Sequence, residues 1–256
     1  MNPPDPERSP AWIIAHRGAS RRCPGNTLAA FDEALRAGCD AIEFDVQLSR
    51  DGVPVVWHDR TLNRAGGGRT RVAQSTTTEL RRLDAAARFP GGFARQPIPT
   101  LDGVLSRYSR RTRLLVEIKA REAPFWNLRL ARAAADAVAR HRASGSVLIL
   151  SFDPAVLDEL GSVAPRLRRV LNVEPPRSLP AALRRRMAEL TALSANVRTL
   201  TRRFAAEVRR AGCPLLVYTC NTPQRVRTAL DCGASGVMSD RPGWLRERLA
   251  SAGEDR

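Results

Sequence analysis

Lysine and histidine are scarce in this sequence. Of the 42 lysine and arginine residues in the 256-residue chain, only Lys119 is a lysine, and there are three histidines. Arginine therefore carries almost all of the positive charge behind the formal net charge of +16. The arginines are spread along the chain with little aromatic interleaving, which favours solvated helix faces over a dedicated nucleic-acid-binding site. Against this background, the single lysine and the two histidines that end apolar runs, His16 and His58, are candidates for chemistry.

Long hydrophobic segments and cysteine motifs are also lacking. No apolar run approaches the roughly 18 residues that a membrane-spanning helix needs, so we expect no membrane span. Residues 1–10 are rich in proline and charge and do not resemble a signal peptide. The five cysteines are odd in number and show no Cys-x-x-Cys spacing, which argues against a disulfide framework or a zinc site. We therefore expect a cytoplasmic protein with reduced thiols.

Short apolar runs alternate with helix-period segments, and this alternation predicts parallel strands joined by helices. The runs are Trp12–Ala15, Ala41–Val46, Val53–Trp57, Leu114–Ile118, Val147–Leu150, Arg169–Val173, Leu193–Val197, Pro214–Tyr218 and Gly236–Met238. The length and the 43% hydrophobic content suit one domain. We predict an α/β fold, a (β/α)8 TIM-like barrel at residues 11–250 that follows an N-terminal tail at residues 1–10. An α/β domain of another topology is the alternative.

The nine apolar runs are one more than an eight-stranded barrel requires, and a hairpin accounts for the additional run. Asp51-Gly52 joins two runs and is a strong signal for a tight turn, whereas a parallel connection needs a dozen or more residues. Val53–Trp57 is therefore predicted to return antiparallel, which places Asp45 directly opposite His58. The glycine- and proline-rich residues 60–113 are predicted to form a short insertion over the barrel mouth.

Charged residues occupy alternate positions at the ends of two predicted strands. Glu43 and Asp45 share one strand face, and so do Glu117 and Lys119. In a closed barrel that face is the interior, where an unpaired charge is costly. Three carboxylates match an oxygen-liganded cation such as Mg²⁺ or Ca²⁺. The alternative is a buried ion-pair network in which Lys119 and Arg17 neutralise the acids.

The remaining groups at the strand ends suit phosphoryl chemistry. Arg17 offers a planar fork for phosphate oxygens, and Lys119 offers a compact charge. His16 and His58 titrate near neutral pH, so they can exchange protons with attacking and leaving oxygens. Active sites of such barrels lie at the C-terminal ends of the strands, where these residues are predicted to meet.

Together these features resemble the glycerophosphodiester phosphodiesterase family. The matching segments are Ala15-His-Arg-Gly18, Pro24-Gly-Asn-Thr-Leu28, Ala41-Ile-Glu-Phe-Asp-Val46, Ser49-Arg-Asp-Gly-Val53, Val55-Val-Trp-His-Asp59, Ile98-Pro-Thr-Leu101, Val116-Glu-Ile-Lys119, Ser151-Phe152, Val217-Tyr-Thr-Cys-Asn221 and Gly236-Val-Met-Ser-Asp240. They cover nearly the whole chain in order, and the length resembles that of the cytosolic bacterial members.

The resemblance implies metal-dependent hydrolysis of a glycerophosphodiester to glycerol 3-phosphate and an alcohol, with one divalent cation, Mg²⁺ or Ca²⁺. The resemblance implies acid–base catalysis by His16 and His58. It implies phosphate contact by Arg17 and Lys119. The implied metal ligands are Glu43, Asp45 and Glu117. The expected partner is a small-molecule substrate.

The sequence departs from the family pattern at Gly25, where the family usually has glutamate. The change removes a negative group near the barrel mouth and bears on the metal site or on substrate fit. Two alternative functions stay open at this stage. One is a related barrel phosphodiesterase that acts on phospholipids or lysophospholipids, and the other is a non-enzymatic polyanion-binding protein. The oligomeric state is also open.

Overall fold

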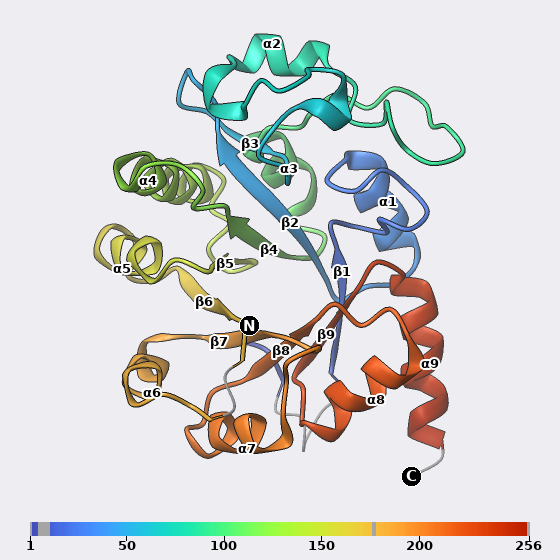
Figure 1. Ribbon diagram of the computed structural model, residues 1–256, viewed down its shortest axis with the longest axis vertical. Helices are drawn as coiled ribbons and strands as arrows, with labels where there is room; N and C mark the ends of the chain where they lie inside the picture. The colour runs from blue at the N-terminus through green and yellow to red at the C-terminus, as the bar shows by residue number, and fades with distance from the viewer. Residues whose placement is uncertain (1, 5–10, 176–177, 255–256) are drawn as a thin grey trace.

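The computed structural model describes residues 2–4, 11–175 and 178–254. Within these residues the strands are β1 Trp12–His16, β2 Ala41–Leu48, β3 Pro54–Val56, β4 Arg113–Ile118, β5 Val147–Ser151, β6 Arg168–Val173, β7 Ala192–Asn196, β8 Leu215–Tyr218 and β9 Gly236–Ser239. All strands except β3 pair in parallel in the order β1-β9-β8-β7-β6-β5-β4-β2, and a β1–β2 pairing closes the ring. The predicted (β/α)8 barrel is therefore confirmed (Figure 1). Residues 1 and 5–10 of the predicted tail lie outside the described residues.

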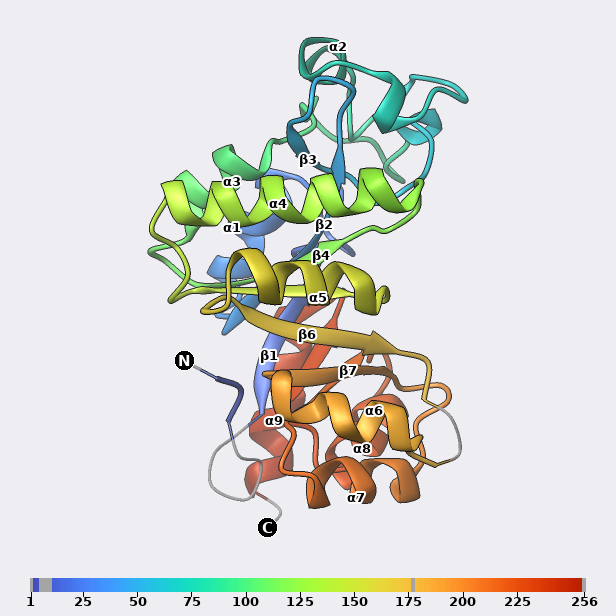
Figure 2. The same ribbon diagram turned by 90° about the vertical axis from the view of Figure 1, so that its left-hand side faces the viewer.

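Helices follow the strands and cover the outside of the ring. Their bounds are α1 Leu28–Arg36, α2 Thr77–Arg82, α3 Leu101–Tyr108, α4 Pro124–Arg140, α5 Pro154–Val163, α6 Ala181–Arg186, α7 Arg202–Arg210, α8 Pro223–Asp231 and α9 Pro242–Glu254. In both ribbon views α4 and α5 lie side by side along the barrel (Figures 1 and 2). Short 3₁₀ segments lie at Asn63–Ala65, Val72–Gln74 and Met187–Glu189. Among the described residues, no helix combines the length and the apolar character needed to cross a bilayer.

Hydroxyl and carboxylate side chains fix the starts of several helices. Thr27, Thr201 and Thr222 accept hydrogen bonds from backbone N–H groups in the first turns of α1, α7 and α8. Asp153 does the same for α5. Such caps satisfy N–H groups that have no partner inside the helix. The capped helices α5, α7 and α8 start three, six and five positions after the end of the strand before them, whereas a longer loop joins β1 to α1.

The β2–β3 hairpin forms as predicted, but its register differs by one residue. Val46 pairs with Val56, and the N–H of Trp57 donates to the carbonyl of Asp45 at 3.0 Å. Trp57, and not His58, thus lies opposite Asp45, so the predicted pairing was wrong. The turn is a three-residue loop that ends at Gly52 with φ +80°, whereas the predicted pairing corresponds to a two-residue turn. The additional loop residue moves every cross-strand pair by one position.

The barrel interior changes from apolar to polar along its axis. Towards the N-terminal ends of the strands it is filled by buried apolar side chains, namely Trp12, Ile14, Ala41, Leu115, Leu148, Leu150, Val170, Ala192, Leu216 and Met238. The inward-facing residues that follow on β1, β2 and β4 are His16, Glu43 and Glu117. The packed apolar part closes the barrel from below, and the polar residues gather at its C-terminal end.

The segment between β3 and α3 builds a second, smaller core. Its buried members are Val55, Trp57, Leu62, Ala65, Val72, Leu80, Ala85 and Ile98. The indole N–H of Trp57 donates to the carbonyl of Thr61 at 3.1 Å, which ties the chain after β3 to this core. The segment extends from the barrel beside β2 and β3, at the top of Figure 1. Phe89 and Pro90 of this segment line a cavity together with both candidate histidines, as expected of an insertion near the mouth.

Candidate active site

A left-handed turn directly after β1 brings His16 and Arg17 to the mouth of the barrel. Arg17 has φ +56° and Gly18 has φ +80°. A Cβ atom on Gly18 would lie 2.6 Å from the backbone of Ala30, so only glycine fits there. In this conformation the N–H of Arg17 donates to Glu43 Oε2 at 3.1 Å. The turn therefore connects the end of β1 to an acid on β2.

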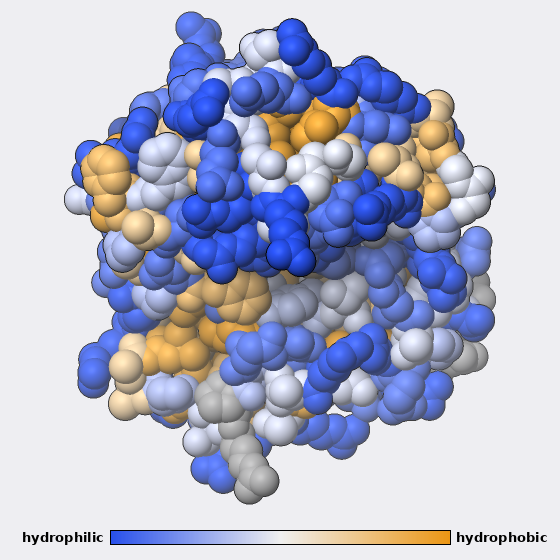
Figure 3. Space-filling view, turned by 45° about the horizontal axis from the view of Figure 1, so that its top comes forward, coloured by the Kyte–Doolittle hydropathy of each residue, from blue (hydrophilic) through white to orange (hydrophobic). Residues whose placement is uncertain are grey.

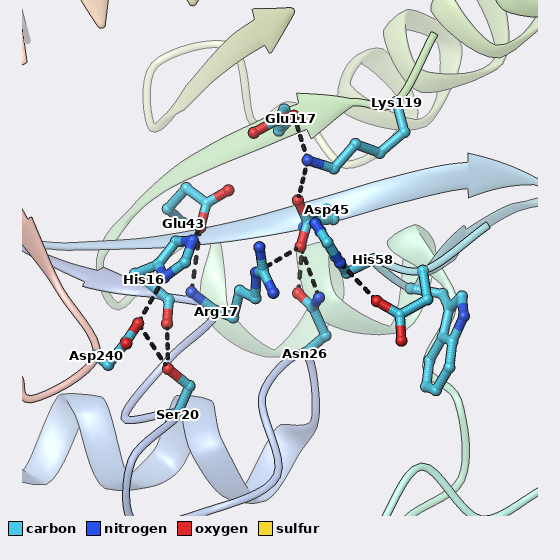
Figure 4. Close-up of polar contacts among 12 residues, drawn as sticks. His16, Arg17, Ser20, Asn26, Glu43, Asp45, His58, Glu117, Lys119 and Asp240 are labelled. Carbon is cyan, nitrogen blue, oxygen red and sulfur yellow. Dashed lines mark hydrogen bonds and ion pairs between the residues drawn. The ribbon is translucent and has the colours of Figure 1, made fainter. Parts of the chain in front are cut away.

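The three predicted metal ligands lie together. Glu43 and Asp45 are 1% exposed and Glu117 is 8% exposed. Each offers a carboxylate oxygen, and these oxygens lie within 4.8 Å of one another. Lys119 Nζ is 2.8 Å from Asp45 Oδ1 and also contacts Glu117. Arg17 Nε is 3.1 Å from Asp45 Oδ2 (Figure 4).

The protein compensates these charges unevenly. Burial disfavours an ionised Asp45, but Arg17 and Lys119 outweigh it and hold the pKa of Asp45 well below its usual range. Burial and the charge of Asp45 raise the pKa of Glu43 to about 7. The same two causes raise the pKa of Glu117. Two of the three carboxylates therefore lack a full counter-charge from the protein, and this oxygen donor set fits a hard divalent cation.

Asn26 is a site residue that sequence reasoning missed. Its Nδ2 donates to Asp45 Oδ2 at 2.8 Å, and the backbone N–H of Asp45 donates to Asn26 Oδ1 at 3.1 Å. Asn26 is 3% exposed and has φ +63°, a conformation that asparagine tolerates better than most residues. The sequence signal that could have identified Asn26 was its position between Gly25 and the N-cap residue Thr27. The two hydrogen bonds fix the Asp45 carboxylate.

Asp240 is a second residue that the sequence analysis did not assign. It directly follows β9, and its Oδ1 lies 2.6 Å from His16 Nδ1. Ser20 Oγ donates to the same oxygen at 3.2 Å, and Asn221 Nδ2 donates to Oδ2 at 2.5 Å. Its position at the end of the last apolar run was the sequence signal. Asp240 orients the His16 ring (Figure 4).

The two histidines have pKa values shifted in opposite directions. Burial disfavours the charged form of His16, but the hydrogen bond to Asp240 and the charge of Glu43 outweigh it and raise its pKa. For His58, burial dominates and lowers the pKa to about 4, although Asp45 acts in the other direction. His58 Nδ1 lies 2.7 Å from Asp59 Oδ1. His16 therefore holds a proton more readily than His58 does.

Two cavities meet at these residues. One has a volume of about 470 Å³ and is lined by His16, Arg17, Glu43, His58, Glu117 and Lys119, among others. A second, of about 250 Å³, shares His16, Arg17 and His58 with the first and extends towards the segment after β3. Figure 3 shows a hollow bordered mainly by hydrophilic residues, with a hydrophobic patch beside it. The larger cavity is within the size range of small-molecule sites.

The structure brings all seven predicted site residues together at the C-terminal ends of β1, β2 and β4 and just after β3. The third histidine lies elsewhere, because His141 Nε2 is 3.0 Å from Asp102 Oδ1 on α3. Gly25 lines the smaller cavity. A Cβ atom at this position would lie 3.1 Å from Ser20 Cβ and 3.2 Å from Arg17 Cβ, so the turn leaves little room for a side chain.

Comparison with known proteins shows the family of this chain. Residues 16–244 match the model of the "Glycerophosphoryl diester phosphodiesterase family". The chain belongs to this family. A glycerophosphodiester phosphodiesterase from Caldanaerobacter subterraneus is 30% identical over 241 residues, covering 94% of this chain and 98% of the relative.

Solved structures show the same fold. A chain from Silicibacter pomeroyi superposes with a TM-score of 0.86 and 28% identity, covering 96% of this chain and 95% of the other. A phosphodiesterase from Oleispira antarctica, solved in complex with the product sn-glycerol-3-phosphate, has a TM-score of 0.83 and 26% identity, with 94% and 97% coverage. The acids and histidines of this chain therefore lie on a barrel whose fold the Silicibacter and Oleispira proteins share.

Proposed function

We propose that this protein hydrolyses glycerophosphodiesters to sn-glycerol 3-phosphate and an alcohol, with one divalent cation, Mg²⁺ or Ca²⁺. The observation that carries the proposal is a cluster of three buried acids beside one cavity, which two of these acids line together with two cations and two histidines with opposed pKa shifts. Family membership and the product complex of the Oleispira relative support the substrate class.

Glu43, Asp45 and Glu117 would hold the cation, since their carboxylate oxygens converge. When bound, it supplies positive charge that stabilises the phosphoryl oxygens in the transition state. The raised pKa values of Glu43 and Glu117 fit this role, because a cation is the counter-charge that the protein itself does not provide. Asn26 keeps the Asp45 carboxylate in a fixed orientation.

Arg17 and Lys119 would bind the phosphate. Both line the cavity beside the acids, and both are anchored to Asp45. A guanidinium presents paired N–H donors to two phosphate oxygens, and an ammonium adds a compact charge. Because these cations are held in place before the substrate arrives, they stabilise the developing charge without reorganisation.

The histidines would move the protons. In the tautomer in which His58 Nδ1–H donates to Asp59, Nε2 carries a lone pair, and the low pKa of about 4 keeps the ring neutral at pH 7. His58 is thus suited to accept a proton from the attacking oxygen. His16, whose pKa Asp240 helps to raise, is suited to donate a proton to the leaving alcohol oxygen.

Release of glycerol 3-phosphate from glycerophosphocholine and glycerophosphoethanolamine tests the proposal. We expect release that chelator and dialysis abolish and that added Mg²⁺ or Ca²⁺ restores. Glu43→Gln should lose the metal-dependent rate. The matched control is Glu33→Gln, which changes a buried acid on α1 that pairs with Arg22 and Arg36, and it should keep the rate. Full activity after dialysis against excess chelator would contradict the metal assignment.

A further inference from the structure

Two polar atoms inside the barrel have no hydrogen-bond partner among the described residues. They are Asn172 Oδ1 on β6 and Ser194 Oγ on β7. Asn172 is 4% exposed and Ser194 is completely buried. Both residues line the 470 Å³ cavity. Buried polar groups in native proteins nearly always have a partner, so two unpaired ones facing the same cavity mark a place where a molecule bound in the cavity supplies it.

The strand registers place this pair across the barrel from the acids. Asn172 and Ser194 are direct partners on neighbouring parallel strands, which lie roughly 4.8 Å apart. In the ring order, β6 lies opposite β1 and β7 lies opposite β2. Asn172 therefore faces His16 across the interior, and Ser194 faces Glu43. All four line the same cavity, which extends from the proposed metal and phosphate site to these two residues.

The residues directly below the pair are apolar. Leu150 and Met238 line the cavity beside it, and the inward-facing residues one step below on the same two strands, Val170 and Ala192, are buried and apolar. The pair and this apolar floor carry no charge to pair with a phosphate or a cationic head group, whereas Arg198, which also lines the cavity, follows β7. An amide oxygen accepts, and a hydroxyl group both donates and accepts, so the pair matches the hydroxyl groups of a small neutral moiety.

We propose that Asn172 and Ser194 form a hydroxyl-binding subsite that holds the glycerol moiety of the substrate. This inference rests on the proposed function, which places the phosphate next to the acids on the opposite wall. The pair lies one inward-facing step beyond the apolar Val170 and Ala192, and we assign to it the part that all substrates share, with the variable alcohol on the side of the mouth. Apolar residues would satisfy packing at both positions, so the polar pair serves recognition.

Inhibition by sn-glycerol 3-phosphate, compared with inhibition by inorganic phosphate, separates this subsite from the phosphate site. Ser194→Ala and Asn172→Leu should each weaken binding of sn-glycerol 3-phosphate about tenfold and leave phosphate binding unchanged. Neither variant should lower Tm, because each removes a buried atom that has no partner in the protein. Ser235→Ala is the control, since Ser235 is 1% exposed and lines a cavity at the other end of the barrel; it should bind both ligands as the wild type does.

Two results would overturn the assignment. Unchanged affinity for sn-glycerol 3-phosphate in both variants would mean that a retained water molecule satisfies Asn172 and Ser194. A rise in KM for glycerophosphoglycerol but not for glycerophosphocholine would mean that the pair binds the leaving alcohol and not the common glycerol. Direct titration of the wild type with sn-glycerol 3-phosphate distinguishes a failure of the proposed hydrolase function from a failure of the glycerol subsite. Binding of this ligand without turnover of any diester would refute the proposed function. The affinities of the two variants for the ligand would still decide whether the subsite exists.

Discussion

Replacing Glu43 with glutamine should stabilise the metal-free protein. Glutamine mimics the protonated carboxyl group, so it removes a buried charge that has no full counter-charge. The pKa of Glu43 rises from an ordinary value of 4.5 to about 7 in the folded protein. Once the pH exceeds the pKa of Glu43 in both the unfolded and the folded protein, this rise lowers the unfolding free energy by about 3 kcal/mol.

The sign follows from proton uptake. Because folding raises this pKa, the folded protein binds a proton that the unfolded chain releases, and stability falls as the pH rises from 4.5 through about 7. Chelated wild type should therefore lose unfolding free energy over this range. Chelated Glu43→Gln should lose less, becoming more stable than the wild type by up to about 3 kcal/mol at about pH 8 and equal to it at about pH 4.

Urea denaturation in excess chelator measures both proteins at the two pH values. A saturating divalent cation should reverse the order, because it binds the folded wild type and restores its stability, whereas the variant has lost a ligand. Glu33→Gln is the control and should not stabilise at either pH, since it removes a charge that arginines already pair. The reasoning fails if chelated Glu43→Gln is no more stable than chelated wild type at the higher pH.

Four further substitutions test individual residues. Alanine at His16 or at His58 should lower kcat by about 10²–10⁴-fold while the circular dichroism spectrum is unchanged, and a near-normal kcat in either variant would remove that residue from the mechanism. Asn26→Ala should lower the unfolding free energy by about 1–3 kcal/mol and raise the cation concentration for half-maximal activity, because Asp45 loses a buried hydrogen bond; wild-type values for both would show that Asn26 does not orient this carboxylate. Gly18→Ala should cost more than about 1 kcal/mol in urea denaturation, because its φ is +80° and the added Cβ would meet the backbone of α1; an unchanged midpoint would contradict the strained-turn argument.

Local periodicity was enough to predict the acid cluster. Glu43 with Asp45, and Glu117 with Lys119, share strand faces because side chains alternate along a strand. The strand order of a closed parallel barrel then brings the two pairs together, since β2 and β4 are neighbours. The alternation of apolar runs and helices carried the same information for the fold as a whole.

Contacts that depend on tertiary structure were not accessible in the same way. Asp240 lies more than 200 positions from His16 in the sequence, and their contact requires the first and last strands, β1 and β9, to pair side by side. The role of Asn26 depends on a left-handed backbone conformation. The register of the β2–β3 hairpin depends on the conformation at Gly52, because a two-residue and a three-residue turn can share the sequence Asp-Gly.

The most direct test of the central claim is to identify the products formed from glycerophosphocholine in the presence of Mg²⁺ or Ca²⁺. Phosphorus NMR distinguishes the two phosphate esters that hydrolysis can release. The account predicts sn-glycerol 3-phosphate together with free choline, and no reaction after chelation. Phosphocholine together with free glycerol, or an intact diester under all metal conditions, would contradict it.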